Sequence, residues 1–552
     1  MNRGLVILLS LVTLTLLSCS KKDNSVPPVP ENFIVTGVTI NGNGSPVQYN
    51  VPYSPTIKVS FSANVDRTTI ATNLLLKENG ATALPLNITY SDNDSVVILQ
   101  PTTPLLPITK YTLSAASSLQ SIRHTNIQGT FTISFITQID STDKFPLLTD
   151  NQLLDKVQQQ TFKYFWDFGH PVSGMARERN TSGDLVTTGG TGFGIMAMIA
   201  AVNRGFITRT EARDRILLIT NFLTTNCTRY HGAFSHWING STGATMPFSN
   251  NDNGADLVET SYLMEGLITA RQFFNTADPT ETSLRTKINA LWSAVEWNWF
   301  RQGNQNVLYW HWSPDKGWIM NVQVRGWDEA LITYVLASSS PTDSIPKIVY
   351  DNGWAGNGSI RNNNTYYGYQ LPLGPSLGGP LFFEHYSFLG INPNGLADAY
   401  ANYQTQTTNH TKINYEYCKA NPRGWNGYSN LCWGLTASDV PNGYQASEPN
   451  NDIGVIAPTG ALSSMPYTPT ESMNALRFFY YKLGDKIWGQ YGFTDAFKLS
   501  DPWFATSYLA IDQGPIIDMI ENYRSGLLWN LFTSAPEIKN GMRRLGFTAP
   551  YL

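Results

Sequence analysis

The chain has 552 residues, a formal net charge of −4 and a pI near 6.0. This length allows two or three domains. The slightly acidic balance excludes the basic surface typical of nucleic-acid-binding proteins, so no nucleic-acid partner is expected. Charged residues make up only 14% of the chain and aromatic residues 12%. Because globular proteins average roughly 25% charged residues, we expect a polar but weakly charged surface.

The N-terminus predicts an export signal. An arginine at position 3 is followed by an apolar run that ends in "LLSC" at Cys19. The run is short for a membrane span, and a small residue before the cysteine is typical of a lipoprotein processing site. We expect residues 1–19 to be a lipoprotein signal peptide with Cys19 lipidated, and residues 20–32 to be a flexible tether. An uncleaved anchor helix is the alternative. Either way the protein is exported, and we expect it in the periplasm or outer membrane of a Gram-negative bacterium.

Three further cysteines follow, Cys227, Cys418 and Cys432. Export permits a disulfide, and Cys418 and Cys432 are the nearest pair in the sequence. Spacing alone does not establish bonding, so their pairing stays open.

Residues 33–138 predict a β-sandwich. Short runs such as "TIKVSFS" and "SVVILQP" alternate apolar and polar residues between turn signals. This segment is similar to bacterial immunoglobulin-like modules and contains no tryptophan or cluster of acids. A spacer or supporting role is favoured over carbohydrate binding.

Residues 139–150 are predicted to be a linker, and residues 151–552 to form an all-α domain. Apolar residues there recur with helical period, and segments that are apolar all round alternate with amphipathic ones. Alternating inner and outer helices joined by long Gly/Asn/Trp-rich loops indicate an (α/α)6 toroid. A helical solenoid is the competing architecture, but the segments share no fixed repeat length.

A group of acids marks the start of one all-apolar helix. In "NNDNGADLVETSYLMEGLITA", Asp252, Asp256 and Glu259 are spaced by four and three residues. If the helix starts near residue 252, they form one acidic row. Because like charges are costly in a closed core, this row is expected to open on a cavity. The alternative is that Asp252 caps the helix and that Asp256 and Glu259 pair with arginines.

Two other apolar helices also begin with acids. Asp328 and Glu329 stand in "VRGWDEALITYVL", and Asp512 precedes Gly514–Pro515, which we interpret as a helix start. In a toroid these ends would converge on one rim. Glycoside hydrolysis requires such convergence, with one carboxyl to protonate the leaving oxygen and a carboxylate to activate water.

Other chemistries lack their motifs. The seven histidines form no HExxH pair, and CxxC pairs, phosphate-binding loops and GxSxG elbows are missing. We therefore expect neither a metal nor a cofactor.

The motifs "TGGTGFGIMAMIAAVNRGF", "HGAFSHWIN", "NNDNGADLVETSYLMEG", "GWDEAL", "GGPLFFEHYSFLGINP" and "LAIDQGPIIDMIENYRSGLLW" resemble the glucoamylase-like (α/α)6 proteins of glycoside hydrolase family 144 over about residues 150–550. The resemblance implies an inverting, metal-independent hydrolase of β-1,2-glucan or its oligosaccharides. The action is endo, or exo with release of sophorose. The N-terminal sandwich is similar to the architecture of the exo-acting branch.

The resemblance also implies roles for the acids. Asp252, Asp256 and Glu259 match the family's acidic cluster, Glu329 matches a separate glutamate and candidate general acid, and Asp512 matches an acid at the edge of the site. Water activation is left to Asp256, Glu259 or Asp512.

Loops rich in aromatic and polar residues supply candidate substrate-binding groups, because flat rings stack on a pyranose while polar groups bind its hydroxyls. Each residue is also of a kind that packs within a fold. These candidates are Arg177, Glu178, His231, His236, Trp237, Trp310, Trp327, His385, Tyr386 and Trp503. We expect a monomer with a glucan partner. A non-catalytic glycan-binding lipoprotein and a same-fold enzyme acting on another glucan remain alternatives.

Overall fold

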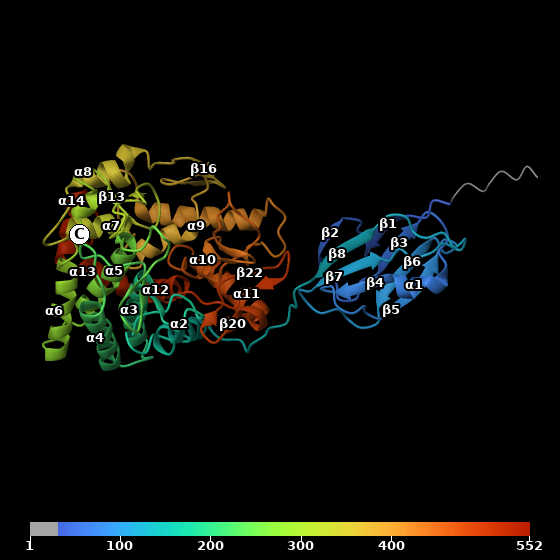
Figure 1. The fold of residues 1–552 in the computed structure, drawn as a ribbon, viewed down its shortest axis with the longest axis horizontal. Helices are drawn as coiled ribbons and strands as arrows, with labels where there is room; N and C mark the ends of the chain where they lie inside the picture. Colours follow the sequence, from blue (N-terminus) through green and yellow to red (C-terminus); the bar gives the residue numbers. More distant parts are fainter. Residues whose placement is uncertain (1–30) are drawn as a thin grey trace, which may run out of the picture. The chain divides into compact units, whose positions relative to one another are not determined.

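The computed structural model describes residues 31–552, which divide into two compact units, a β-sandwich and a helical domain (Figure 1). The predicted signal peptide, Cys19 and the tether up to residue 30 lie outside the described residues. Among residues 31–552, none of the helices combines the length and apolar character that a membrane crossing requires.

The sandwich consists of two four-stranded sheets. One has the order β1-β3-β6-β5 and the other β2-β8-β7-β4, and the pairings of β3 with β1 and β6 are antiparallel. Side chains alternate as the sequence predicts; in β3, Ile57, Val59 and Phe61 are buried and Lys58 is exposed. The bounds are β1 Val35–Ile40, β2 Val47–Val51, β3 Ile57–Phe61, β4 Leu74–Glu78, β5 Leu86–Ser91, β6 Val96–Pro101, β7 Lys110–Ala115 and β8 Phe131–Thr137, with helix α1 at Arg67–Asn73.

The helical domain is a closed ring of inner helices within outer ones. Nearly every residue of α3, α5, α7, α10 and α12 is buried, whereas α2, α4, α6, α9 and α11 bury one face. The bounds are α2 Asp150–Trp166, α3 Thr188–Asn203, α4 Arg209–Thr225, α5 Leu257–Phe273, α6 Pro279–Ser293, α7 Leu331–Ser339, α8 Lys347–Val349, α9 Tyr403–Ala420, α10 Pro458–Leu462, α11 Pro469–Ile487, α12 Ala510–Ser525, α13 Leu527–Ser534 and α14 Pro536–Leu545.

The inner ring closes on itself. Helix α3 packs on α5, α5 on α7, and α7 on the short 3-10 helix η5 (Tyr386–Phe388), which follows η4 (Leu381–Glu384). His385 then bonds Ser464 just after α10, α10 packs on α12, and α12 returns to α3. The predicted sandwich followed by an (α/α)6 helical domain is confirmed. A solenoid would not return to its first helix.

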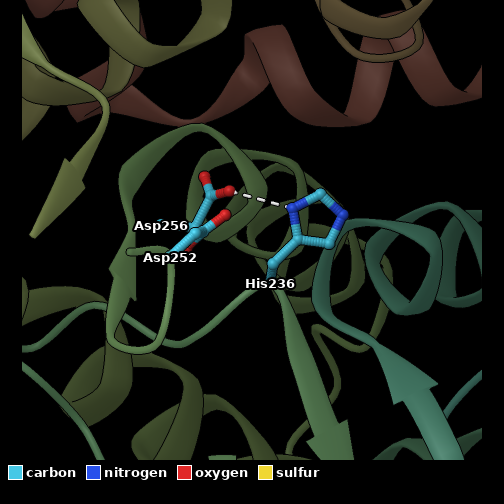
Figure 2. A group of neighbouring side chains, drawn as sticks. All are labelled: His236, Asp252 and Asp256. Atoms are coloured by element: carbon cyan, nitrogen blue, oxygen red, sulfur yellow. Dashed lines mark hydrogen bonds and ion pairs between the residues drawn. The ribbon is translucent and has the colours of Figure 1, made fainter. Parts of the chain in front are cut away.

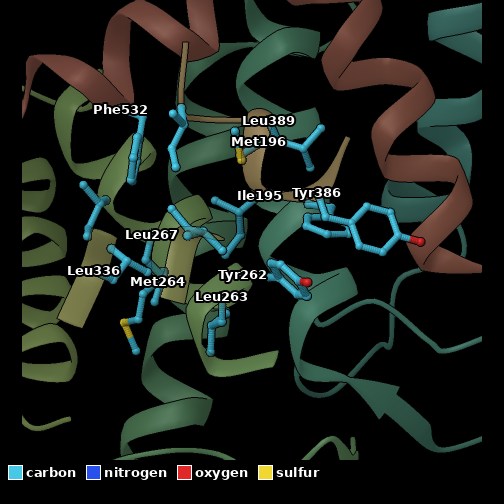
Figure 3. Packing of buried hydrophobic residues seen from close by; sticks show 14 of the residues in the cluster. Ile195, Met196, Tyr262, Leu263, Met264, Leu267, Leu336, Tyr386, Leu389 and Phe532 are labelled. Atoms are coloured by element: carbon cyan, nitrogen blue, oxygen red, sulfur yellow. The ribbon is translucent and has the colours of Figure 1, made fainter. Parts of the chain in front are cut away.

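Glycines let the central helices approach each other closely. A Cβ on Gly192 of α3 would lie 2.1 Å from the Tyr262 carbonyl oxygen of α5, and one on Gly266 would lie 2.2 Å from the Gly192 carbonyl oxygen. Only glycine fits at such a backbone contact. Around it, Ile195 and Met196 of α3 face Leu263 and Leu267 of α5 in one apolar core (Figure 3).

Two predicted helix starts were wrong. Helix α5 begins at Leu257 with Asp256 as its N-cap, so Asp252 lies in the preceding turn and the three acids form no helical row. Helix α12 begins at Ala510, which places Asp512 in its first turn and Pro515 inside the helix. Cys227, Cys418 and Cys432 are free thiols in the structure.

Candidate active site

The inner helices surround a cavity of about 410 Å³. Its walls bring together groups from segments far apart in the sequence. Seven of the candidates from the sequence line it: Glu178, His236, Trp237, Glu259, Trp310, Glu329 and Tyr386. Aromatic faces and carboxyls in one concave site are the groups that bind a sugar ring and its hydroxyls.

The N-terminal end of α5 holds two of the acids. The Asp256 side chain caps the helix by accepting a hydrogen bond from the Glu259 backbone N–H, at 2.9 Å. The Glu259 carboxylate in turn accepts a hydrogen bond of 2.7 Å from the Gly189 backbone N–H, in the first turn of α3. Two helix N-termini therefore orient Glu259, whose side chain borders the cavity, whereas Asp256 is fully buried.

His236 connects these two carboxylates. It precedes β10 (Trp237–Asn239), and its Nδ1 lies 3.0 Å from Asp256 Oδ2 (Figure 2). Its Nε2 lies 3.9 Å from Glu259 Oε1. Burial opposes a charged imidazole, but the charges of Glu259 and Asp256 raise the pKa of His236 to about 9. At neutral pH the imidazolium neutralises part of the acidic cluster.

The three acids differ in protonation. Burial acts to raise the pKa of Asp256, but the His236 hydrogen bond and the charges of His311 and His236 outweigh it and lower that pKa. Burial and the charge of Asp256 raise the pKa of Asp252 to about 7. Burial also raises the pKa of Glu259. Asp256 is thus the one of these three carboxyls whose pKa its surroundings lower.

His311 completes the cluster from a neighbouring strand. It lies opposite Asp256 in the pairing of β12 (Ala255–Asp256) with β14 (His311–Trp312), and its Nε2 is 3.7 Å from both Asp252 Oδ2 and Asp256 Oδ2. Donor atoms of His236, Asp252 and Asp256 all lie within 4.8 Å of one another, so this set could hold a metal ion. The imidazolium of His236 supplies positive charge at the same place.

Glu329 approaches the cavity from another helix. It stands just before Ala330, the N-cap of α7, and its carbonyl oxygen accepts hydrogen bonds from the Ser387 and Tyr262 hydroxyls. Burial raises the pKa of its carboxyl to about 7, and the charges of Glu259 and Asp256 add to the effect. This carboxyl therefore holds a proton in the range where an enzyme transfers one.

A second carboxyl group lies behind another part of the wall. Asp512 is 2% exposed, and burial together with Asp495 raises its pKa well above the usual range. The two carboxyls share a hydrogen bond. Asp495 also accepts a 2.6 Å hydrogen bond from the Asp439 backbone N–H, and the Asp439 side chain pairs with Arg179 at 3.1 Å. Asp512 is thus a buried neighbour of the cavity, while Ile511 beside it lines the wall.

The structure does not place five of the candidate binding residues at the cavity. The Arg177 guanidinium bonds two backbone carbonyls and lies over Phe168. His231 pairs with Glu296 at 2.8 Å. Trp503 packs on a small separate cluster around Val455.

The other two of the five are held by bonds inside the protein. Trp327 donates its Nε1–H to Glu384 at 3.0 Å, and His385 bonds Ser464 at 2.9 Å. For all five, satisfied contacts within the fold explain the residue, so the expectation of a substrate contact is not supported.

Several site residues escaped the sequence reasoning. Arg179 directly follows the two candidates Arg177 and Glu178 in the sequence. Tyr444 comes from the hairpin of β18 (Ala437–Val440) and β19 (Gly443–Ala446), for which the Pro441–Asn442 turn was a usable signal. The other residues come from loops, helices and short strands, and the sequence reasoning did not single them out: Phe248, Tyr262, His311, Phe382, Asp439 and Asp495.

The fold and the site together define a glucoamylase-like (α/α)6 protein carrying an N-terminal immunoglobulin-like module. The family model Glycoamylase, described as "Putative glucoamylase", matches residues 321–536, and the bacterial Ig-like domain model matches residues 35–137. The chain belongs to this glucoamylase-like family.

Relatives with similar sequences support membership of this glucoamylase-like family. A solved structure of the same description from Bacteroides uniformis is 55% identical, with a TM-score of 0.73, over 74% of this chain and 100% of that one. An endo-β-1,2-glucanase from Chitinophaga pinensis, solved with sophorotriose and glucose, is 48% identical, with a TM-score of 0.72, and the shares are again 74% and 100%.

A curated relative adds an activity on the same linkage. It is an exo-β-1,2-glucooligosaccharide sophorohydrolase (non-reducing end) from Parabacteroides distasonis, 47% identical over 431 residues. The match covers 74% of this chain and 59% of the relative's length.

Proposed function

We propose that the protein is a glycoside hydrolase that cleaves β-1,2-glucosidic bonds in β-1,2-glucan or its oligosaccharides. The observation that carries this proposal is the pair Glu259 and Glu329, which line one cavity and both have a raised pKa. Relatives at 47–48% identity that act on β-1,2-linked glucans supply the substrate class.

Glu329 is the general acid. Its carboxyl, with a pKa of about 7, gives its proton to the glycosidic oxygen as the bond from C1 to that oxygen breaks. Glu259 faces the same cavity and takes a proton from the water whose oxygen bonds to C1. His236 supplies the positive charge that compensates Glu259, and Asp256 holds both His236 and the backbone N–H of Glu259. The family resemblance supports inversion at C1.

Aromatic side chains hold the glucosyl units against this pair. Trp237, Trp310 and Tyr386 line the same cavity as the two glutamates. Their flat faces suit the apolar face of a pyranose, while Glu178 and Arg179 present charged groups to its hydroxyls.

The test is product analysis. The purified protein is incubated with linear β-1,2-glucan and, separately, with short sophorooligosaccharides, and products are resolved over time by chromatography. A ladder of oligomers indicates endo action, and sophorose alone from the first time point indicates exo action. Product from another glucan but from neither β-1,2 substrate would refute the substrate class. Binding without any product would refute the enzymatic proposal.

We further infer that the protein works as an exported, lipid-anchored monomer. The basis is the sequence "LLSC" at Cys19 after an apolar N-terminal run. Metabolic labelling with a fatty acid, compared between the natural chain and Cys19→Ala, tests the anchor. Equal labelling of both would contradict it.

A further inference from the structure

A second cavity, of about 510 Å³, lies in the helical domain and shares no lining residue with the catalytic cavity. It lies around the 3-10 helix η1 (Trp299–Arg301) and the loop after it. Its volume falls within the roughly 300–1,000 Å³ of small-ligand sites. Nothing in the catalytic proposal uses it.

Stacked aromatic rings form one wall. Trp318 stacks on Trp299 with centroids 4.7 Å apart, and His231 stacks on Trp299 at 3.4 Å. Because two rings cannot share one face, both faces of Trp299 are occupied. Trp318 is further braced edge-on by Phe300 and Tyr309. The half-buried Trp318 is therefore a fixed flat surface that needs little ordering when a ligand binds.

Polar groups line the rest of the cavity. The Glu296 carboxylate accepts a 2.8 Å hydrogen bond from His231, and the Asp343 carboxylate accepts one of 2.8 Å from the Asn298 backbone N–H. Asn304 adds an exposed side-chain amide. Braced tryptophans beside carboxylates and amides match the two faces of a sugar ring, one apolar and one rimmed by hydroxyls.

We propose that this cavity is an accessory binding site for glucosyl units of the glucan chain, with Trp318 as the stacking platform. The inference rests on the proposed function, because it takes its ligand from that substrate. The two carboxylates of the cavity, Glu296 and Asp343, already accept hydrogen bonds from His231 and from the Asn298 backbone N–H. The role that we assign to this site is therefore binding and not cleavage.

One loop borders both cavities. Trp310, at the catalytic cavity, and Trp318, at the accessory cavity, lie eight positions apart between β13 (Leu308–Tyr309) and β15 (Gln323–Val324). A glucan chain that reaches both sites gains from the high effective concentration of the second site. A short oligosaccharide reaches only one. The accessory site therefore acts selectively on long chains.

The test separates binding of polymer from catalysis on short substrates. Trp318→Ala is compared with the conservative Trp318→Phe and with Tyr523→Ala, which removes an exposed ring elsewhere. Binding is measured by affinity electrophoresis in gels containing linear β-1,2-glucan, with Glu329→Gln in the background to prevent hydrolysis. Turnover is measured without that background on long glucan and on short sophorooligosaccharides.

We expect Trp318→Ala to weaken glucan binding and raise KM for long glucan about threefold to tenfold, the range for a lost ring contact. The value of kcat/KM on short sophorooligosaccharides should stay unchanged, and Trp318→Phe should retain most of the binding. If Trp318→Ala fails to fold, Asn304→Ala on the exposed rim replaces it, with the same selective loss expected.

Unchanged glucan binding in a folded variant would overturn the proposal, as would an equal loss on short and long substrates. Failure of the two proposals is distinguishable. If the wild type cleaves β-1,2-glucan and the accessory-site variants bind and cleave it equally well, only the accessory-site proposal is refuted. A wild type that neither cleaves nor binds it refutes both.

Discussion

Replacement of Glu329 by glutamine is the sharpest test of the mechanism. The amide keeps the size of the side chain but has no acidic proton to donate. A general acid typically contributes about 10²–10⁴-fold to the rate, so kcat/KM on β-1,2-glucan should fall by that factor. Circular dichroism should show an unchanged fold.

The pH dependence follows from the pKa of the same group. Burial, with Glu259 and Asp256, raises the Glu329 pKa from 4.5 to about 7, so the proton is present below pH 7 and lost above it. The protonated fraction is about nine-tenths at pH 6, half at pH 7 and one-tenth at pH 8. The value of kcat/KM should therefore fall about tenfold per pH unit on the alkaline side.

A substrate with an activated leaving group distinguishes a proton donor from a structural glutamate. Nitrophenolate departs without protonation, so a nitrophenyl β-sophoroside should be cleaved by Glu329→Gln at a rate close to that of the wild type. The matched control is Glu416→Gln, on the surface of α9 beside Lys419, which should behave as wild type on both substrates. An equal loss of activity on both substrates would refute the assignment of Glu329 as the acid.

Three further predictions concern the supports of the site. The pKa of His236 is about 9, so the stabilisation from its ion pairs is complete below about pH 6.5 and is lost as pH rises through 9. His236→Gln should therefore lower the melting temperature more at pH 6.5 than at pH 9.5. An equal decrease at both pH values would contradict this reasoning. Gly192→Ala forces a Cβ against the α5 backbone and should cost about 1–3 kcal/mol or more, measured by urea unfolding, whereas Gly37→Ala, in open space, should not. Trp310→Ala should raise KM, because Trp310 lines the cavity. Trp327→Phe should instead cost about 1–3 kcal/mol of stability, because the buried Glu384 carboxylate loses the hydrogen bond that Trp327 donates. A raised KM in Trp327→Phe would contradict its structural role.

The β-sandwich and the helical domain could be predicted because the sequence patterns that indicate them are local. In β3 apolar and polar residues alternate, as expected for a strand with one buried face. The α3 segment is apolar on all sides over 16 residues, as expected for a helix inside a domain. The close approach of α3 and α5 was not predictable in the same way. Gly192 and Gly266 face each other across 74 residues of sequence, and a single glycine in an apolar run does not reveal what lies opposite it.

The acidic cluster was predicted correctly as a group but for a wrong geometric reason. The sequence suggested Asp252 as the possible helix cap, but spacing does not show which of two nearby aspartates starts the helix. The structure selects Asp256 and leaves Asp252 in the turn before it. The two aspartates still meet, because a chain reversal at Ser249 and the pairing with His311 fold the turn back on the helix end.

Several aromatic and histidine candidates do not line the cavity and are instead held by contacts within the fold. Trp327 and His385 lie beside acids of the sequence motifs, yet each uses a ring nitrogen in a hydrogen bond to a buried partner, Glu384 for Trp327 and Ser464 for His385. Sequence gives no sign of such partners because they are 57 and 79 residues away. Trp310 lies in an equally aromatic segment but lines the cavity.

The distribution of positive charge explains why so many carboxyls surround one cavity. On the α5 side, Asp256 is held ionised by His236. On the other side, Arg179 balances Asp439, and the buried Asp512 keeps a proton next to Asp495. Most of the acids are thereby paired or neutral, which lowers the cost of packing them together.

Glu259 and Glu329 are the exceptions, because both face the cavity. Burial raises the pKa of both carboxyls. The charge of His236, 3.9 Å away, acts against this effect at Glu259, whereas the charges of Glu259 and Asp256 add to it at Glu329. The two surroundings thus suit the roles that we propose, with Glu329 as the acid and Glu259 as the base. Removing the charge of His236 should reduce the difference in pKa between Glu259 and Glu329. Substitution of His236 therefore tests the mechanism as well as the stability.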